Sequence, residues 1–121
     1  MSLVAEQDIF LSDVARLISK AHDLGFQISA GEMWRTPEQQ KIYFDSGRSK
    51  TMDSNHIKRL AVDLNFFKDG KLIGDKGTLQ PIGEWWESLN PQNRWGGSWR
   101  GLVENGKSNF VDLPHFERNI T

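Results

Sequence analysis

Three residues stand out in the sequence because their side chains suit a metal ion: His56, Asp63 and His115. Asp63 interrupts the apolar run at 60–67, where burial of an unpaired carboxylate would be costly, so it is expected to be paired or bound to a metal. Two imidazoles and one carboxylate leave one tetrahedral position of zinc open, which is the pattern of catalytic zinc sites. Other divalent ions accept the same ligands. Spacing alone does not decide between such a site and a core aspartate with two surface histidines.

Further polar residues lie where they can assist hydrolysis at such a site. Asp112 lies shortly before His115 and can reach a water molecule as a general base. Arg35 stands just ahead of an expected helix, and a guanidinium suits either a substrate carboxylate or an oxyanion. Glu117 has two open interpretations: it hydrogen-bonds a ligating imidazole, or it is a surface charge.

The alternation of side chains along two expected strands predicts how these residues are presented. In the strand at 60–67, one face is wholly apolar, and Asp63 lies on the other face with Ala61, Asn65 and Phe67. In a last strand at about 109–116, His115 shares a face with Leu113 and Glu117, and Pro114 suggests a strand at the edge of the sheet. If the two strands are neighbours, the three candidate ligands converge.

The remaining elements are predicted from helix and turn signals. A helix at 11–24 should end at Gly25, and a short strand should follow at 26–30. A second helix should start after Thr36 as its cap and stop at Gly47. A hairpin turn at 68–71, a helix at 80–89 and an Asn-Gly turn at 104–107 complete the pattern. Helices and antiparallel hairpins in this order favour an α+β fold.

Composition narrows the class of protein. The chain has 121 residues, a net charge of −1 and no cysteine. This balance gives no electrostatic case for nucleic acid as a partner, and it excludes disulfides and thiolate metal sites. There is no apolar run long enough for a transmembrane helix, and residues 1–10 do not read as a signal peptide. We therefore expect one domain over 1–121, without a membrane anchor and cytoplasmic in location.

Aromatic residues and one further histidine have structural interpretations. Trp85 and Trp86 occur at helical spacing and are expected in the core. Trp95 and Trp99 flank a Gly-Gly-Ser segment and are equally compatible with packing and with lining a cleft. His22 has no acidic or histidine neighbour at a useful spacing, so we expect it to be solvated.

Three segments together resemble one known family, the D-alanyl-D-alanine/L-alanyl-D-glutamate zinc peptidases. The family includes vancomycin-resistance dipeptidases and carboxypeptidases and several phage endolysins. "SNHIKRLAVDL", at 54–64, resembles its Ser-x-His-x-x-Gly-x-Ala-x-Asp signature, except that Arg59 replaces the glycine. "DLPHFE", at 112–117, resembles its second signature, and "WRTPEQQ", at 34–40, resembles its Arg-Thr segment. The three segments also occur in the order typical of the family.

The resemblance implies a fold and a set of roles. The fold would be a compact α+β domain of the Hedgehog and D,D-peptidase type, whose central antiparallel sheet carries the metal and is flanked by helices. The resemblance implies that His56, Asp63 and His115 bind Zn²⁺, that Asp112 is the catalytic acidic residue and that Arg35 contacts the substrate or the oxyanion. Ser54 and Gln39 are weaker candidates for substrate binding, and helix capping is the favoured role of Gln39.

The resemblance also implies a substrate and a setting. The substrate would be a peptidoglycan stem peptide, cut most plausibly at the L-Ala–D-Glu bond by a monomeric phage-type endolysin. Such an enzyme waits in the host cytoplasm and reaches the bacterial cell wall at lysis. The alternatives are a D-Ala-D-Ala carboxypeptidase or dipeptidase of the same fold, and a non-catalytic wall-peptide-binding or phage structural module.

Overall fold

The structure is a computed structural model that describes residues 1–49, 52, 54–98 and 111–120. The described elements are, in order, α1 (Leu3–Asp23), β1 (Gln27–Ala30), α2 (Pro37–Asp45), β2 (Ala61–Lys68), β3 (Lys71–Leu72), α3 (Lys76–Leu89), β4 (Asn93–Trp95), the short 3-10 helix η1 (Gly96–Ser98) and β5 (His115–Arg118).

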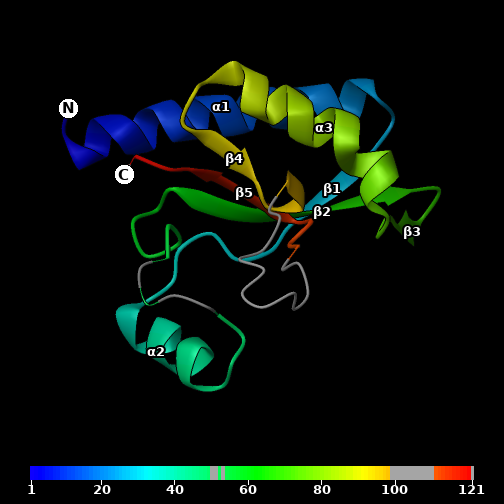
Figure 1. The fold of residues 1–121 in the computed structure, drawn as a ribbon. Helices are drawn as coiled ribbons and strands as arrows, with labels where there is room; N and C mark the ends of the chain where they lie inside the picture. Colours follow the sequence, from blue (N-terminus) through cyan, green and yellow to red (C-terminus); the bar gives the residue numbers. More distant parts are fainter. Residues whose placement is uncertain (50–51, 53, 99–110, 121) are drawn as a thin grey trace.

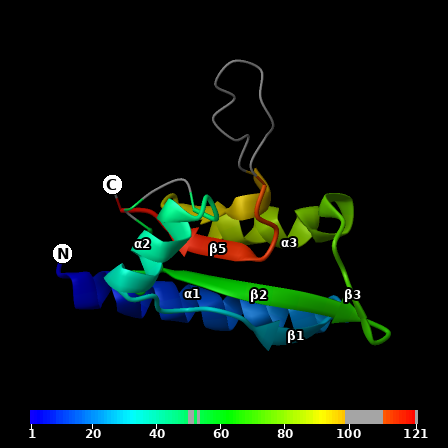
Figure 2. The same cartoon turned by 90° about the horizontal axis from the view of Figure 1, so that it is seen from below.

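The strands form one antiparallel sheet in the order β1-β2-β5-β4, with β3 paired to the end of β2. The helices α1 and α3 cover one face of this sheet, and α2 lies on the other side (Figure 1). β2 and β5 lie side by side, and their register places Asp63 opposite His115 (Figure 2). The structure thus confirms the α+β expectation and the adjacency of the two strands that carry the candidate ligands.

The core lies between the sheet and the helices α1 and α3, as the alternation along β2 predicts. Val62, Leu64 and Phe66 are buried toward the helices, whereas Asp63 and Asn65 on the opposite face are only half-buried. The buried apolar residues that contact one another are Phe10, Val14, Leu17, Ala21, Phe26, Leu60, Val62, Leu64, Phe66, Leu79, Ile82, Trp86, Trp95 and Phe116. One face of the sheet is therefore used for stability, and the other is open to carry polar chemistry.

The first helix is longer than predicted, because it begins at Leu3 rather than near residue 11. Ser2 caps it, accepting a hydrogen bond from the backbone nitrogen of Ala5 at 3.1 Å. Exposed apolar side chains such as Val4 obscure the buried stripe in this part of the sequence. The end was predicted correctly, since Gly25 adopts a φ of 89°.

The first residues of the other two helices are set by their N-terminal caps. α2 runs from Pro37 to Asp45 as expected, with Thr36 accepting a hydrogen bond from the backbone nitrogen of Gln39 at 3.0 Å. α3 begins at Lys76, earlier than the predicted residue 80, because the Asp75 carboxylate caps it through the backbone nitrogen of Thr78 at 2.9 Å.

The prediction for the last strand was wrong in two respects. Within the described residues the strand starts at His115 and ends at Arg118, later than predicted. It is not an edge strand, because β2 and β4 flank it on both sides. Pro114 precedes the first paired residue, so its missing N–H costs the sheet no hydrogen bond. The predicted turn at 104–107 lies outside the described residues, and β4 (Asn93–Trp95) was not predicted.

The hairpin between β2 and β3 forms at the predicted Asp-Gly turn, where Asp69 and Gly70 have φ values of 52° and 76°. We expect Gly70→Ala to lower the free energy of unfolding by about 1–2 kcal/mol, because a side chain is disfavoured at positive φ. Among the described residues other than its two chain neighbours, nothing lies within 4 Å of the added Cβ, so the cost is conformational rather than steric. Chemical denaturation measures it, and unchanged stability would contradict the assignment of this turn.

The structure shows the burial of three of the tryptophans and the exposure of His22. Trp86 and Trp95 are 0 % exposed, so packing is the role of Trp95, whereas Trp85 is half-buried. Trp99 lies outside the described residues, and His22 is exposed as expected. Within the described ranges, no helix combines the length and apolarity needed to cross a bilayer.

Candidate metal centre and active site

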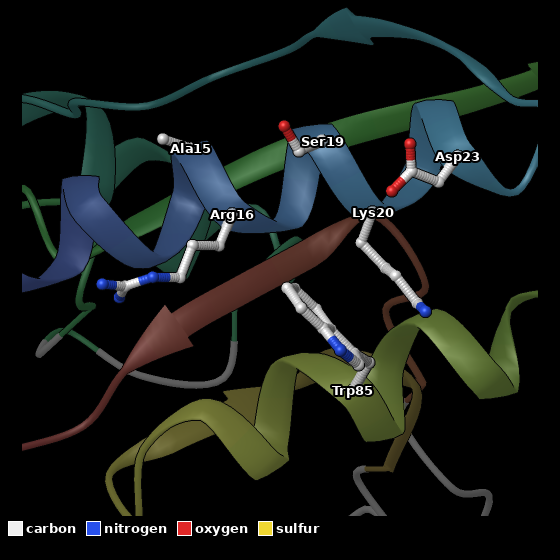
Figure 3. A pocket seen from close by; sticks show the side chains of 6 residues that line it. All are labelled: Ala15, Arg16, Ser19, Lys20, Asp23 and Trp85. Atoms are coloured by element: carbon white, nitrogen blue, oxygen red, sulfur yellow. The ribbon is translucent and has the colours of Figure 1, made fainter.

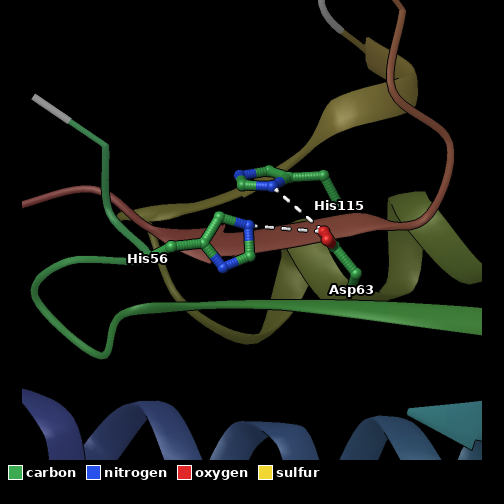
Figure 4. A group of neighbouring side chains, drawn as sticks. All are labelled: His56, Asp63 and His115. Atoms are coloured by element: carbon green, nitrogen blue, oxygen red, sulfur yellow. Dashed lines mark ion pairs between the residues drawn. The ribbon is translucent and has the colours of Figure 1, made fainter. Parts of the chain in front are cut away.

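The structure brings the three candidate ligands together on the side of β2 that faces away from α1 (Figure 4). Oδ1 of Asp63 lies 3.4 Å from Nε2 of His56 and 3.5 Å from Nδ1 of His115. One ligand atom from each residue falls within 4.8 Å of the other two. His56 comes from the turn before β2, Asp63 from β2 and His115 from the first position of β5, so the pairing of β2 with β5 builds the cluster.

The donor set fits a tetrahedral divalent ion. Zinc bonds of about 2.0–2.2 Å to nitrogen and oxygen put neighbouring tetrahedral ligands about 3.3–3.6 Å apart, close to the separations of Asp63 from the two imidazoles. Within the described part of the chain, Oδ1 of Asp63 is buried and accepts no hydrogen bond. A buried carboxylate oxygen without a donor is unusual, and a cation between the three side chains would satisfy it.

Both imidazoles are oriented by acceptors on the side away from Asp63. Nδ1 of His56 lies 3.0 Å from the backbone oxygen of Met33, and Nε2 of His115 lies 2.6 Å from Oε1 of Glu117. A carbonyl and a carboxylate can only accept, so these ring nitrogens carry the hydrogens. The lone pairs of the opposite nitrogens then point toward Asp63, which is the tautomer that a metal ligand needs.

Glu117 is therefore not a surface charge. Its residue is 8 % exposed, and its second oxygen accepts a hydrogen bond from the Asn55 side chain at 2.9 Å. Asn55 lies next to His56 in the sequence, so Glu117 links the turn that carries His56 to the ring of His115. Of the two interpretations that the sequence left open, burial rules out the surface charge, and the contact with His115 is the one that the other interpretation requires. A role of Glu117 in metal binding stays a prediction.

We expect Glu117→Gln to weaken zinc binding about 10-fold to 100-fold, because a neutral amide is a poorer partner for a ligating imidazole than a carboxylate. Titration calorimetry on the metal-free protein measures the effect. Glu84→Gln is the matched control, since Glu84 is exposed on α3 and should leave the affinity unchanged. Equal zinc affinities of the two variants would contradict this role.

The cluster is strongly polarised without a metal. Burial alone would raise the pKa of Asp63, but the imidazoles of His115 and His56 outweigh it and hold the pKa well below its usual range. Burial alone would lower the pKa of His115, but the carboxylates of Asp63 and Glu117 outweigh it and raise the pKa to about 9. The carboxylates on both sides of His115 therefore favour a positive charge at this position, and a cation bound between the three side chains would supply one.

Asp112 lies next to this cluster. Its residue is half-buried, and the charges of His115, Asp63, His56 and Arg35 all act on its carboxyl group. Burial raises the pKa of Asp112 above its ordinary value, and the charge of Asp63 adds to that effect against the opposing charge of His115. A carboxyl group whose pKa is raised toward neutral pH is better suited to accept a proton and to return it.

Arg35 is held in one orientation by its neighbours. Its Nε donates to the carboxylate of Glu32, and its Nη1 donates to Oε1 of Gln40 at 2.6 Å. The guanidinium carbon lies 4.7 Å from the centre of the Tyr43 ring. Within the described residues Nη2 makes no hydrogen bond, so one edge of the guanidinium is left for a ligand.

The two weaker candidates have structural contacts. Ser54 is 8 % exposed, and its hydroxyl accepts from the backbone nitrogen of His56 at 3.2 Å and from Nη1 of Arg35 at 3.5 Å. It therefore links the turn of one candidate ligand to Arg35. The backbone nitrogen of Gln39 is bound to the cap Thr36. Substrate contact by either side chain stays a prediction.

The neighbours of the site that sequence reasoning missed include Glu32, Met33 and Gln40. Gln40 is 0 % exposed on a helix that otherwise buries little, which is a signal only once the helix is placed. Glu32 lies three residues before Arg35, and an acidic residue at this distance from an arginine is too common in sequences to indicate a site. Met33 contacts His56 through its backbone carbonyl, and every residue type has this group, so the sequence gives no signal for it.

A hollow lies between α1 and α3 (Figure 3), on the face of the sheet opposite to the metal cluster. Its cations are engaged within the protein: Arg16 pairs with Asp13 at 2.8 Å, and Nζ of Lys20 lies 5.8 Å from the centre of the Trp85 ring. The lining residues are Ala15, Arg16, Ser19, Lys20, Asp23 and Trp85. They include one carboxylate, that of Asp23, and no histidine, so they do not repeat the donor set of the cluster at His56.

Comparison with known protein families gives a match that covers most of the site. A family model described as D-alanyl-D-alanine carboxypeptidase matches residues 47–118. This span is more than half of the chain, and it contains both candidate histidine ligands, Asp63, Asp112 and Glu117. Arg35 lies outside it.

The individual proteins that this chain resembles are also peptidases by name. The L-alanyl-D-glutamate peptidase of Listeria phage A118 is 31% identical over an alignment of 110 residues that covers 86% of this chain and 34% of that protein. The chain therefore spans about a third of the length of this relative. The crystal structure of the L-Ala D-Glu endopeptidase ChiX of Serratia marcescens superposes with a TM-score of 0.65 at 24% identity, over 89% of this chain and 79% of that one. This likeness shows the fold.

Proposed function

The chain belongs to the D-alanyl-D-alanine carboxypeptidase family of peptidases, and we propose that it is a zinc-dependent peptidase that cleaves stem peptides of bacterial peptidoglycan. The observation that carries this proposal is the convergence of Nε2 of His56, Oδ1 of Asp63 and Nδ1 of His115. Of these atoms, Oδ1 of Asp63 is buried and accepts no hydrogen bond within the described residues. Asp112 lies beside them, so the ligands and a proton acceptor share one site.

In this proposal His56, Asp63 and His115 hold the ion. When bound, zinc supplies Lewis-acid polarisation of the scissile carbonyl and makes a water molecule more acidic. Asp112 accepts the proton of the attacking water and returns it to the leaving amine. Arg35 presents the open edge of its guanidinium to the carbonyl oxygen or to a substrate carboxylate. Met33 and Glu117 keep the two imidazoles in the required tautomer.

We propose the L-Ala–D-Glu bond as the bond that is cut. Support comes from the names of two relatives, an L-alanyl-D-glutamate peptidase and an L-Ala D-Glu endopeptidase. The description of the family model favours a second candidate, removal of a terminal D-Ala by a carboxypeptidase. A non-catalytic module is less well supported, because this chain retains all three ligands and Asp112.

The setting and extent of the protein are parts of the same proposal. Residues 1–121 form one catalytic domain, monomeric and acting as an endolysin on the cell wall once lysis begins. Support comes from the shared core of the sheet with α1 and α3, and from the phage origin of one relative.

Mass spectrometry of products from defined stem peptides tests the specificity. Incubation with zinc should release fragments with a new N-terminal D-Glu, whereas the carboxypeptidase alternative predicts release of D-Ala. Failure to cut either bond while zinc is bound would contradict the enzymatic function and favour the binding module.

A further inference from the structure

The segment that carries Asp112 and His115 is fastened to the end of β4 by two hydrogen bonds. The backbone nitrogen of Asp112 donates to the carbonyl of Gly96 at 3.1 Å, and Nε1 of Trp95 donates to the carbonyl of Leu113 at 2.9 Å. Within the segment, the backbone nitrogen of His115 donates to the carbonyl of Asp112 at 3.1 Å. Residues 112–115 therefore form a turn whose outer side is held by Trp95 and Gly96.

Gly96 permits this close approach. A Cβ at this position would lie 2.1 Å from the carbonyl oxygen of Asp112 and 2.9 Å from Cβ of His115. Both separations are below van der Waals contact, and the first involves backbone that cannot rotate away. The start of η1 therefore lies directly against the turn, at a residue that has no side chain to keep the two backbones apart.

Trp95 is itself held rigidly. The residue is 0 % exposed, and its backbone nitrogen donates to the Glu87 carboxylate at 3.1 Å. Its ring fills the space over two glycines, since a Cβ at Gly83 or Gly97 would come within 2.0 Å or 2.3 Å of ring atoms. The direction of its N–H group is thus fixed by packing on α3 and η1. Phenylalanine would fill most of this space, so packing alone does not require the indole nitrogen.

We propose that Trp95 is a positioning residue for Asp112: its indole N–H fixes the 112–115 turn so that the Asp112 carboxyl group faces the metal cluster. This inference rests on the proposed peptidase function and assigns a role to a side chain that touches neither the substrate nor the metal. Trp95 acts through the backbone of Leu113, next to Asp112 in the chain. Because a displacement of about 1 Å in a reacting group can cost about 100-fold in rate, one hydrogen bond at this point is enough to matter.

The chain offers a matched control in Trp86. Both residues are 0 % exposed, and Nε1 of Trp86 also donates to backbone carbonyls, those of Arg94 at 3.2 Å and Glu117 at 3.3 Å. Trp95→Phe and Trp86→Phe each remove an indole N–H and a similar volume. Trp95→Phe releases the turn that carries Asp112. Trp86→Phe releases the backbone of Glu117 instead, which contacts the candidate ligand His115 and not Asp112.

We expect Trp95→Phe to lower kcat about 10-fold to 100-fold on a stem peptide, with KM and calorimetric zinc affinity nearly unchanged. Trp86→Phe should leave kcat at saturating zinc within about threefold, and its effect through Glu117 should appear in the zinc affinity. Both variants should unfold at lower denaturant concentration because each loses a buried hydrogen bond. In the metal-free proteins, the ¹³C resonance of the Asp112 carboxyl group should move in Trp95→Phe and stay in place in Trp86→Phe.

A double-mutant cycle separates positioning of Asp112 from general damage to the site. In the Asp112→Asn background, Trp95→Phe should have little further effect on kcat, because the group that it positions is already inactive. Equal kcat losses in Trp95→Phe and Trp86→Phe, or a full additional loss in the Asp112→Asn background, would overturn the inference while leaving the peptidase function intact. Absence of hydrolysis by the unaltered protein would overturn the proposed function and this inference with it.

Discussion

His56→Ala is expected to lower stem-peptide hydrolysis at least about 10³-fold and to abolish tight zinc binding. A catalytic metal contributes several kcal/mol of transition-state stabilisation, and each ~1.4 kcal/mol corresponds to a factor of ten in rate. The loss should be large because removal of one ligand leaves Asp63 and His115 alone, and two protein ligands do not make a stable zinc site. Hydrolysis rates at fixed zinc concentration and calorimetric titration of the metal-free variant measure the two effects.

His22→Ala is the matched control for this prediction. It removes an imidazole from the exposed surface of α1, far from the cluster in the fold. It should leave both hydrolysis and zinc stoichiometry unchanged. A His56→Ala protein that still binds one zinc ion tightly and hydrolyses its substrate at the original rate would show that the cluster is not the metal centre.

The second large effect is expected at Asp112. Asp112→Asn should lower kcat about 10²-fold to 10⁴-fold, because an amide cannot accept the proton of the attacking water. Zinc affinity should stay close to that of the unaltered protein, because Asp112 is not one of the three ligands. Steady-state kinetics at saturating zinc, together with calorimetry, separates the two quantities.

Asp8→Asn makes the same chemical change at an exposed position on α1 and should leave kcat unchanged. If Asp112→Asn instead abolished zinc binding, Asp112 would be a ligand rather than a base. If it left kcat unchanged, another group would have to move the proton.

Local signals predicted α2 and the hairpin between β2 and β3. Thr36, Pro37 and Gly47 define α2 without reference to the rest of the chain, and Asp69 with Gly70 defines the hairpin. The strand β4 escaped prediction because its three residues are too few for an alternating pattern. Its existence depends on pairing with β5, which is a tertiary contact.

The site was predictable in its residues but not in its supporting contacts. The types and order of His56, Asp63 and His115 suggested a metal, and the family resemblance selected that interpretation. Their convergence depends on the register that places Asp63 opposite His115, which local sequence does not encode. The orienting contact of Met33 is made by its carbonyl group, so it could be found only in the structure.

The structure also explains how Arg59 can replace the glycine of the family signature. Arg59, which stands where the pattern has glycine, adopts a φ of 58°, in the left-handed region that favours glycine. Its guanidinium carbon lies 4.8 Å from the centre of the Trp34 ring, and this contact offsets part of the conformational cost. The turn that carries His56 therefore keeps its shape without the glycine.

The most direct test of the zinc peptidase account is a titration of the metal-free protein with zinc while stem-peptide hydrolysis is followed. The account predicts no hydrolysis before zinc is added, a rise in rate in proportion to bound metal and a plateau at one ion per chain. Hydrolysis at full rate in the presence of a chelator, or binding of one zinc ion without any cleavage of stem peptides, would contradict it.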